Sequence, residues 1–242
     1  EAVEDDVGDL DDEPAEDQVG NRGLEHAALL QALEQAEFAH GEVFVGAEEF
    51  VQDMFPQLKD PRFPNLPREL TFIHAEDILE MYPDLPRKQR ETRLIQECPA
   101  VFIYGIGWPL ADGYPHELRA ADYDDWVTPT GNDRKGLNGD ILVWNPVTKH
   151  RHELTSMGIR VTAETLVEQM KLADREDELS QPYHQMILND EIPLSIGGGI
   201  GQSRVQMLLL RRCGYVPMVA FRLFYYLAWH VLWGHARLGL LY

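Results

Sequence analysis

Two β-rich runs separated by a turn-forming tetrapeptide constrain the fold of this chain more than any other feature. Residues 140–144 (DILVW) and 152–156 (HELTS) lie on either side of Asn145-Pro146-Val147-Thr148. Short runs of this kind that flank a turn are typical of an antiparallel β-hairpin. A four-residue turn would set Asp140 nearly opposite Glu153, so we expect an antiparallel sheet that carries two carboxylates.

The remaining pattern mixes helices with strands. Apolar residues at intervals of three and four predict a helix over about 24–40. A continuous apolar run at 101–106 (VFIYGI) predicts a buried central strand, whereas the glycine-rich stretch 107–139 predicts one or more loops. The fold class is therefore α+β, in one domain after the first 23 residues. Further helices are expected at about 47–55, 75–82, 86–97, 162–172 and 177–188, and a further strand at about 70–73.

The composition excludes several classes of function. The chain has 242 residues, of which 44% are apolar, which is enough to bury a sizeable core and excludes a disordered or fibrous protein. With 21 Lys and Arg against 41 Asp and Glu, the formal net charge is −20. Binding to nucleic-acid phosphates needs clustered positive charge, so we expect no direct nucleic-acid contact.

The two cysteines and the start of the chain bear on its compartment. Cys98 and Cys213 are too far apart in sequence to indicate a disulfide framework or a metal site. No signal peptide is visible, so we expect a reducing compartment, either the cytoplasm or the mitochondrial matrix. Because the sequence does not begin with methionine, we expect it to start inside a longer precursor, a processed protein or a fragment.

Both ends of the chain predict contacts with a protein assembly. Residues 1–17 contain ten acidic residues and no basic residue. We therefore expect the tail over 1–23 to be disordered in the isolated chain and to become ordered when it binds a basic surface of a partner. Residues 213–242 form an aromatic, apolar extension. Its apolar run over 214–233 is interrupted by Arg222 and His230, so we expect it to pack against a partner and not to span a membrane.

A glycine cluster precedes the last predicted helix of the domain. The run Ile196 to Arg204 (IGGGIGQSR) leads into an apolar helical stretch. Glycines such as Gly199 and Gly201 let backbone and ligand approach closely, free amides at a helix N-terminus can bind an anion, and Arg204 could lie over a purine ring. The spacing is not that of a Rossmann fingerprint. A purely structural role for the glycines stays open.

The carboxylates of the predicted hairpin suggest a metal site. Like charges that face each other across two strands destabilise a sheet, unless a cation lies between them. Hard oxygen ligands select Mg²⁺, which also binds nucleotide phosphates, so Asp140 and Glu153 indicate an ATP·Mg site. The alternative is that both side chains point to solvent and never meet.

A third cluster lies in the long loop, at residues 119–126 (RAADYDDW). Carboxylates held by aromatic packing could bind the amino group of an amino acid, or ammonium. The alternative is an acidic surface turn in which Trp126 fills part of the core.

Five segments together resemble a known enzyme family. They begin at Val101 (VFIYGIG), Arg119 (RAADYDDW), Gly136 (GLNGDILVWNP), Glu153 (ELTSMGIRV) and Ile196 (IGGGIGQSR). In this order they resemble the C-terminal part of the ammonia-dependent asparagine synthetases, or aspartate–ammonia ligases. The resemblance is strong over about 72–211. It implies a fold similar to class II aminoacyl-tRNA synthetases, with an antiparallel β-sheet flanked by helices, and a dimeric enzyme that uses ATP and Mg²⁺ to make aspartyl-adenylate, which ammonia then attacks.

The resemblance also implies roles for individual residues. Asp140 and Glu153 would face the ATP phosphates and Mg²⁺, and Arg204 would contact the adenine or the γ-phosphate. Arg160 would support the nucleotide side, where Gly199 and Gly201 also lie. Three further residues would line the pocket for aspartate and ammonia, namely Asp124, Ser156 and Thr155, the last of which stands where the family usually has serine.

One departure from the family governs the expected function. Members carry an upstream part with a dimer-forming segment, an arginine for the α-phosphate and further aspartate-binding residues, which we expect to be missing here. Loss of one such donor typically costs on the order of 10²–10³ in rate. We therefore expect residues 24–212 to form a truncated, catalytically incomplete domain that serves as a structural or interaction subunit. The alternatives are the active half of a split or longer ligase completed by another polypeptide segment, and a free nucleotide-binding module.

Overall fold

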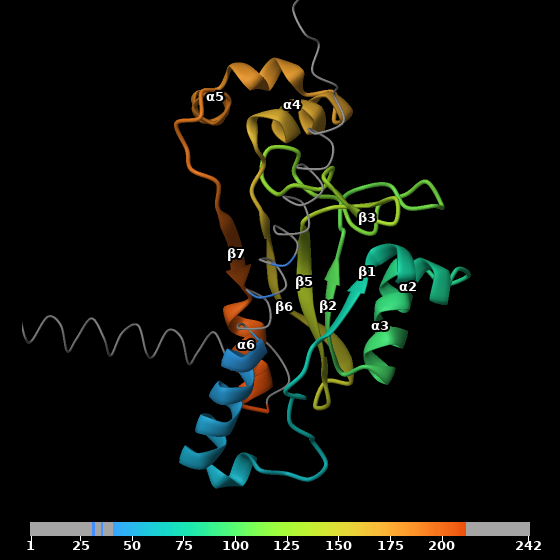
Figure 1. Cartoon of the computed structure of the whole chain (residues 1–242). Coiled ribbons are helices and arrows are strands. Elements are labelled where there is room, and N and C mark those ends of the chain that lie inside the picture. The colour runs from blue at the N-terminus through green and yellow to red at the C-terminus, as the bar shows by residue number, and fades with distance from the viewer. Residues whose placement is uncertain (1–30, 32–34, 36–40, 212–242) are drawn as a thin grey trace, which may run out of the picture.

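The computed structural model describes residues 41–211, together with residues 31 and 35 (Figure 1). The predicted acidic tail over 1–23 and the predicted extension over 213–242 lie outside the described residues. Of the helix predicted over 24–40, only residues 31 and 35 are described, and both are helical. The predictions for the two ends of the chain therefore stay predictions.

A five-stranded sheet organises the molecule and confirms the α+β class. Neighbouring strands are antiparallel, except for the parallel first pair. The parallel pair needs a crossover, which is supplied by helices α2 (Ala75–Met81) and α3 (Arg87–Glu97). In spatial order the strands are β1 (Thr71–His74), β2 (Ala100–Tyr104), β5 (Asn138–Asn145), β6 (His150–Ile159) and β7 (Ile196–Ile200).

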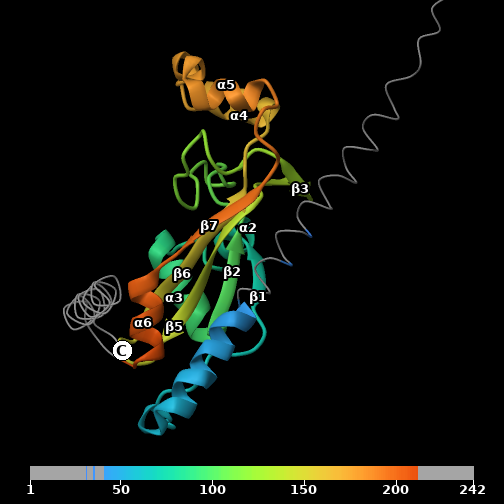
Figure 2. The ribbon, with the colours of Figure 1, turned by 90° about the vertical axis from the view of Figure 1, so that its left-hand side faces the viewer.

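Helices lie on both faces of the sheet, which is therefore a middle layer (Figure 2). On one face, α2 and α3 pack against Val101, Ile103 and Leu142. On the opposite face, a helix over 41–54 and helix α6 (Gln202–Leu209) supply Phe44 and Leu208 to a second core around Phe102 and Ile141. Alternate residues of β2 and β5 thus enter different cores, as the period of two along a strand requires.

A small helical cap lies beyond one end of the strands, at the top of Figure 1. Thr162 caps α4 (Ala163–Leu172) as predicted, because its hydroxyl accepts a hydrogen bond from the Thr165 amide. The helix predicted over 177–188 is divided into the 3-10 helix η2 (Glu176–Ser180) and α5 (Pro182–Leu188). Proline cannot donate to the preceding turn, so it begins a new helix.

Strands form in two stretches where none was predicted. The stretch 107–139 includes a short hairpin of β3 (Pro129–Gly131) and β4 (Arg134–Lys135) and the first residues of β5. The glycine cluster was expected at a helix N-terminus, but residues 196–200 form β7, and only Gly201 lies at the start of α6. A short 3-10 helix, η1 (Pro56–Leu58), precedes the sheet. Within the described ranges, no helix has the length and apolar character needed to cross a membrane.

Candidate active site

The β5–β6 hairpin forms as predicted, but its register differs from the expected one. Asp140 pairs with Ser156 and not with Glu153. The pairing then passes from Ile141 and Thr155 to Leu142 and Glu153, so Leu154 is the extra residue of a β-bulge. Because the bulge shifts the alternation by one residue, Glu153 shares a face of the sheet with Leu142 and therefore with Asp140. The two carboxylates come together along a diagonal, not directly across the strands.

The start of α6 holds this bulge in place. The Gly201 amide donates to the Leu154 carbonyl at 2.7 Å. The Arg204 guanidinium donates both to the Glu153 carbonyl and to its carboxylate, each at 3.0 Å. The backbone and the side chain of Glu153 are thus fixed from the same helix end.

A third carboxylate, which the sequence reasoning missed, joins the pair. Glu117 lies in the loop after β2, and one carboxylate oxygen from each of Glu117, Asp140 and Glu153 lies within 4.8 Å of the others. We call these three residues the carboxylate cluster. Glu117 comes only two residues before the predicted segment 119–126, but no spacing relates it to the hairpin, because it reaches the sheet from a separate loop.

Each member of the carboxylate cluster has its own arginine. Arg204 contacts Glu153, and Arg87 of α3 contacts Glu117 at 3.2 Å. Arg119 makes an ion pair with Asp140 and also donates to the Ser156 hydroxyl at 2.7 Å. Three negative charges converge here because three positive charges surround them.

Asp140 is the most buried member of the cluster. Burial raises the pKa of its carboxyl to about 6, although Arg119 acts in the opposite direction. The neighbouring charge of Glu153 raises this pKa further. A second positive charge beside Asp140 would stabilise its ionised form, and a metal ion would supply that charge.

Asp124 and Arg160 form an ion pair next to the cluster. Burial raises the pKa of Asp124, and the Arg160 charge opposes this shift. The Arg160 guanidinium also lies 3.8 Å from the centroid of the Tyr123 ring. Asp124 is buried, so the segment is not the acidic surface turn that was the alternative prediction, although Trp126 does belong to the core as that alternative expected.

The predicted glycines have different surroundings. A Cβ on Gly197 would meet the Arg160 guanidinium at 2.3 Å, so this glycine leaves room for the Arg160 side chain. Gly199 pairs with Ser156, and a Cβ there would meet no atom within 4 Å. The backbone of β7 beside Ser156 is thus open to an approaching group.

Thr155 is directed away from the carboxylate cluster and from Ser156, although it lines a cavity with Gly199. Successive residues of a strand face opposite sides, so Thr155 lies on the other face from Ser156. Its hydroxyl is buried and accepts a hydrogen bond from the Ile141 amide at 3.3 Å. The structure therefore brings together Asp140, Glu153, Ser156, Arg204, Asp124 and Arg160, with Gly199 and Gly201 beside them.

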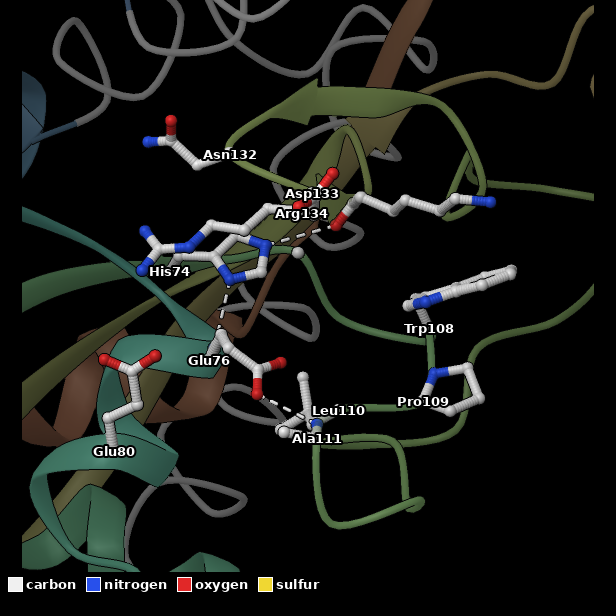
Figure 3. Close-up of a pocket in the computed structure, with 12 residues that line it drawn as sticks. His74, Glu76, Glu80, Trp108, Pro109, Leu110, Ala111, Asn132, Asp133 and Arg134 are labelled. Atoms are coloured by element: carbon white, nitrogen blue, oxygen red, sulfur yellow. Dashed lines mark hydrogen bonds between the residues drawn. The ribbon is translucent and has the colours of Figure 1, made fainter.

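A separate cavity of about 370 Å³ lies at the ends of β1 and β2 (Figure 3). Burial lowers the pKa of His74, whose Nδ1 accepts from the Glu76 amide while Nε2 donates to the Lys135 carbonyl. Two of the charged groups here have partners, since Arg134 pairs with Asp77 and Glu76 accepts from the Ala111 amide. Among the described residues that line this cavity, no group of converging carboxylates occurs.

Comparisons with known proteins bear on the fold and on the family. The structure is similar to the aspartyl-tRNA synthetase from Entamoeba histolytica, with a TM-score of 0.51 and 18% identity over 73% of this chain and 37% of that chain. It also matches the asparaginyl-tRNA synthetase from the same organism in complex with asparaginyl-adenylate, with a TM-score of 0.48 and 17% identity over 77% of this chain and 41% of that chain. The chain thus spans about two fifths of the solved proteins, and the first likeness confirms the class II aminoacyl-tRNA synthetase-like fold.

The family assignment comes from a different comparison. The family model for aspartate–ammonia ligase matches residues 26–221, which is most of the chain. This range includes every member of the carboxylate cluster and every predicted site residue. The predicted family is thereby confirmed: the chain belongs to the aspartate–ammonia ligase family.

Proposed function

We propose that this chain binds ATP·Mg²⁺ and aspartate in a site of the aspartate–ammonia ligase type, and that the site needs a further polypeptide segment for catalysis. The observation that carries the proposal is the convergence of Glu117, Asp140 and Glu153 from three different elements. Convergent carboxylates destabilise a fold unless cations balance their charge. Their convergence beside buried side chains therefore favours a role in binding a cation.

The donor set fits a magnesium ion. Carboxylate oxygens are hard ligands, and Mg²⁺ is commonly bound by one or two carboxylates together with substrate phosphates. Asp140 and Glu153 would hold the ion, with Glu117 as a third ligand. When bound, the ion would neutralise part of the negative charge of the ATP phosphates.

The surrounding side chains would bind the rest of the substrates. Arg204 is half-exposed at the start of α6, where it can turn from Glu153 to a phosphate or to the adenine. Asp124 can attract the amino group of aspartate, and the Ser156 hydroxyl and the Arg119 guanidinium can hold a substrate carboxylate. Arg160 keeps Asp124 in place, and Gly199 leaves β7 open to the nucleotide.

Two features support the view that this site is incomplete in the chain alone. Arg87, Arg119 and Arg160 each contact a carboxylate of the described residues, and Arg204 is assigned to the adenine or the γ-phosphate, so none of these four arginines is assigned to the charge that develops on an α-phosphate. In addition, β7 is an edge strand of the sheet that the described residues form, and Ile200 is 50% exposed in that part of the chain. An exposed edge strand is suited to pairing with another strand.

This open edge bears on what the chain does in an assembly. We favour an interaction subunit, which would make further contacts through residues 1–17 and 213–242. The second candidate is the active half of a split or longer ligase, in which a segment paired with β7 brings the missing arginine. Both candidates place the additional segment beside Gly199 and Ser156, which are partners across β6 and β7.

Two measurements on the full chain test the proposal. Calorimetry should show ATP binding that requires Mg²⁺ and weakens at least about tenfold in Arg204→Ala, whereas Arg62→Ala, a change at an exposed arginine, should bind as the wild type does. Aspartate-dependent release of pyrophosphate should be absent. No binding of ATP·Mg²⁺ would contradict the site, and pyrophosphate release by the chain alone would contradict its incompleteness.

A further inference from the structure

A buried cluster of charged side chains lies between α3 and the hairpin, outside the site just described. Glu91 of α3 and His116 are each 3% exposed. The two carboxylate oxygens of Glu91 have different partners, since one contacts His116 Nε2 at 3.0 Å and the other contacts the Arg151 guanidinium at 2.7 Å. Glu91 therefore ties the loop after β2 to strand β6 through the interior of the protein.

This cluster leads directly to the carboxylate cluster. His116 precedes Glu117 in the chain, and one guanidinium, that of Arg87, holds both residues. Arg87 Nη1 donates to the His116 carbonyl at 2.7 Å, while Nη2 contacts the Glu117 carboxylate at 3.2 Å. Backbone and side chain of the loop are thus fixed from α3 at two successive residues.

Glu117 needs such support more than its two companions do. Asp140 and Glu153 stand on paired strands, whereas Glu117 lies in a bend without regular structure. Metal ligands must be held to within about 0.5 Å of their working position, which a loop does not achieve without packed neighbours. The side chains of α3 provide those neighbours.

We propose that Arg87 and Glu91 are positioning residues of the metal site, which hold Glu117 in place for a divalent cation. The proposal rests on the metal site of the proposed function. Glu91 acts indirectly, because it anchors His116, the residue before Glu117. Arg87 acts directly on the Glu117 carboxylate. Neither residue is itself a ligand.

The charge of Glu91 agrees with this role. Although burial acts to raise its pKa, the hydrogen bond from His116 and the positive charge of Arg151 hold the pKa of Glu91 below its usual value. Glu91 is then a charged anchor for His116 and Arg151, and it also pairs with Arg87 at 3.9 Å. Its replacement would leave the buried His116 and the partly buried Arg151 without their acceptor and would strongly destabilise the fold, so the decisive variant is at Arg87.

Arg87→Lys isolates the positioning effect, because lysine keeps the charge but cannot contact two acceptors with a planar fork. The full chain is titrated with Mn²⁺ alone, and free Mn²⁺ is measured by electron paramagnetic resonance. We expect Arg87→Lys to bind about tenfold more weakly, as is typical when the partner of a ligand is changed. Arg93→Lys is the matched control, because Arg93 lies on the same helix and pairs with the exposed Glu97.

A double-mutant cycle with Glu117→Gln separates positioning from general destabilisation. If Arg87 acts through Glu117, Arg87→Lys should weaken Mn²⁺ binding in the wild type and should add nothing in the Glu117→Gln chain. Equal losses in both backgrounds, or wild-type affinity of Arg87→Lys, would overturn the inference while leaving the metal site intact. If the wild-type chain does not bind Mn²⁺, the proposed metal site itself is wrong, and this inference falls with it.

Discussion

Two groups of acidic side chains in this protein look alike in sequence but differ in space. Asp122, Asp124 and Asp125 are neighbours in the chain, yet each is directed to a different partner. Asp122 contacts His184, Asp124 contacts Arg160, and Asp125 accepts hydrogen bonds from the amides of residues 127 and 128 and from the Thr128 hydroxyl. The carboxylate cluster shows the opposite arrangement, because residues 117, 140 and 153 come from distant parts of the chain and converge.

The difference separates acids that need no metal ion from acids that favour one. Acids that each satisfy their own donors stabilise the loop that carries them without a metal ion. Acids that converge repel one another, so a cation between them is stabilising even when each acid has an arginine beside it. Convergence of acidic residues in space is therefore a stronger indication of a metal site than their density along the sequence.

The largest effect is expected at Asp125. Asp125→Ala removes the acceptor of three buried hydrogen bonds and should lower the free energy of unfolding by about 3–5 kcal/mol. Urea unfolding followed by tryptophan fluorescence measures the loss, because the neighbouring Trp126 lies in the core. Asp133→Asn, at an exposed turn, is the control. A loss below about 1 kcal/mol would show that this group does not support the loop.

Asp140→Asn should act on the metal and much less on folding. The amide keeps the shape of the side chain but offers the cation no charge, so affinity for Mn²⁺ should fall by more than about tenfold. Asp122→Asn should leave the affinity unchanged, since Asp122 belongs to the other acidic group. Equal effects of the two variants in a Mn²⁺ titration would remove the distinction between the groups.

Metal binding should depend on pH through Asp140. A carboxyl must lose its proton to bind a cation, and burial raises the pKa of Asp140 to about 6. Affinity for Mn²⁺ should therefore be full above pH 7 and should fall by up to about tenfold for each unit below about 6. Calorimetry at several pH values between 5 and 8 measures this dependence. Constant affinity over that range would mean that Asp140 does not take part.

The smallest effect is expected at β7. Gly199→Ala adds a methyl group that meets no atom within 4 Å, so the free energy of unfolding should stay the same or rise by up to about 1 kcal/mol. A nucleotide that lies against β7 would meet this group, so ATP·Mg²⁺ should bind several-fold more weakly. Gly46→Ala, which also has open space, is the control for stability. Unchanged nucleotide binding in Gly199→Ala would place the ligand elsewhere.

Much of the fold could be predicted from the sequence because it depends on local pattern. The β5–β6 hairpin, the buried strand β2 and the capped start of α4 all follow from residue type and spacing. The register of the hairpin could not be predicted, because it depends on a bulge that leaves one residue unpaired. Contacts with α6, which lies elsewhere in the sequence, fix the position of that bulge. The glycines of β7 looked like a loop because glycine is rare in strands, and the packing of Arg160 over Gly197 is a tertiary effect.

The site divides in the same way. Asp140, Glu153 and Ser156 share a hairpin, so local pairing brings them near each other, and the family segments pointed to them. Glu117 and Arg87 were missed, because their role depends on how α3 and a loop pack on the sheet. Contacts between segments that are far apart in the sequence produce no periodic pattern from which they could be predicted.

The most direct test of the proposed metal site is a crystal structure of the full chain soaked with Mn²⁺, with the ion located by its anomalous signal. We expect one ion within roughly 2.0–2.6 Å of carboxylate oxygens from residues 117, 140 and 153, with Arg119 or Arg204 moved aside. An ion bound by the acids at 122–125, or no ion at the carboxylate cluster, would contradict it.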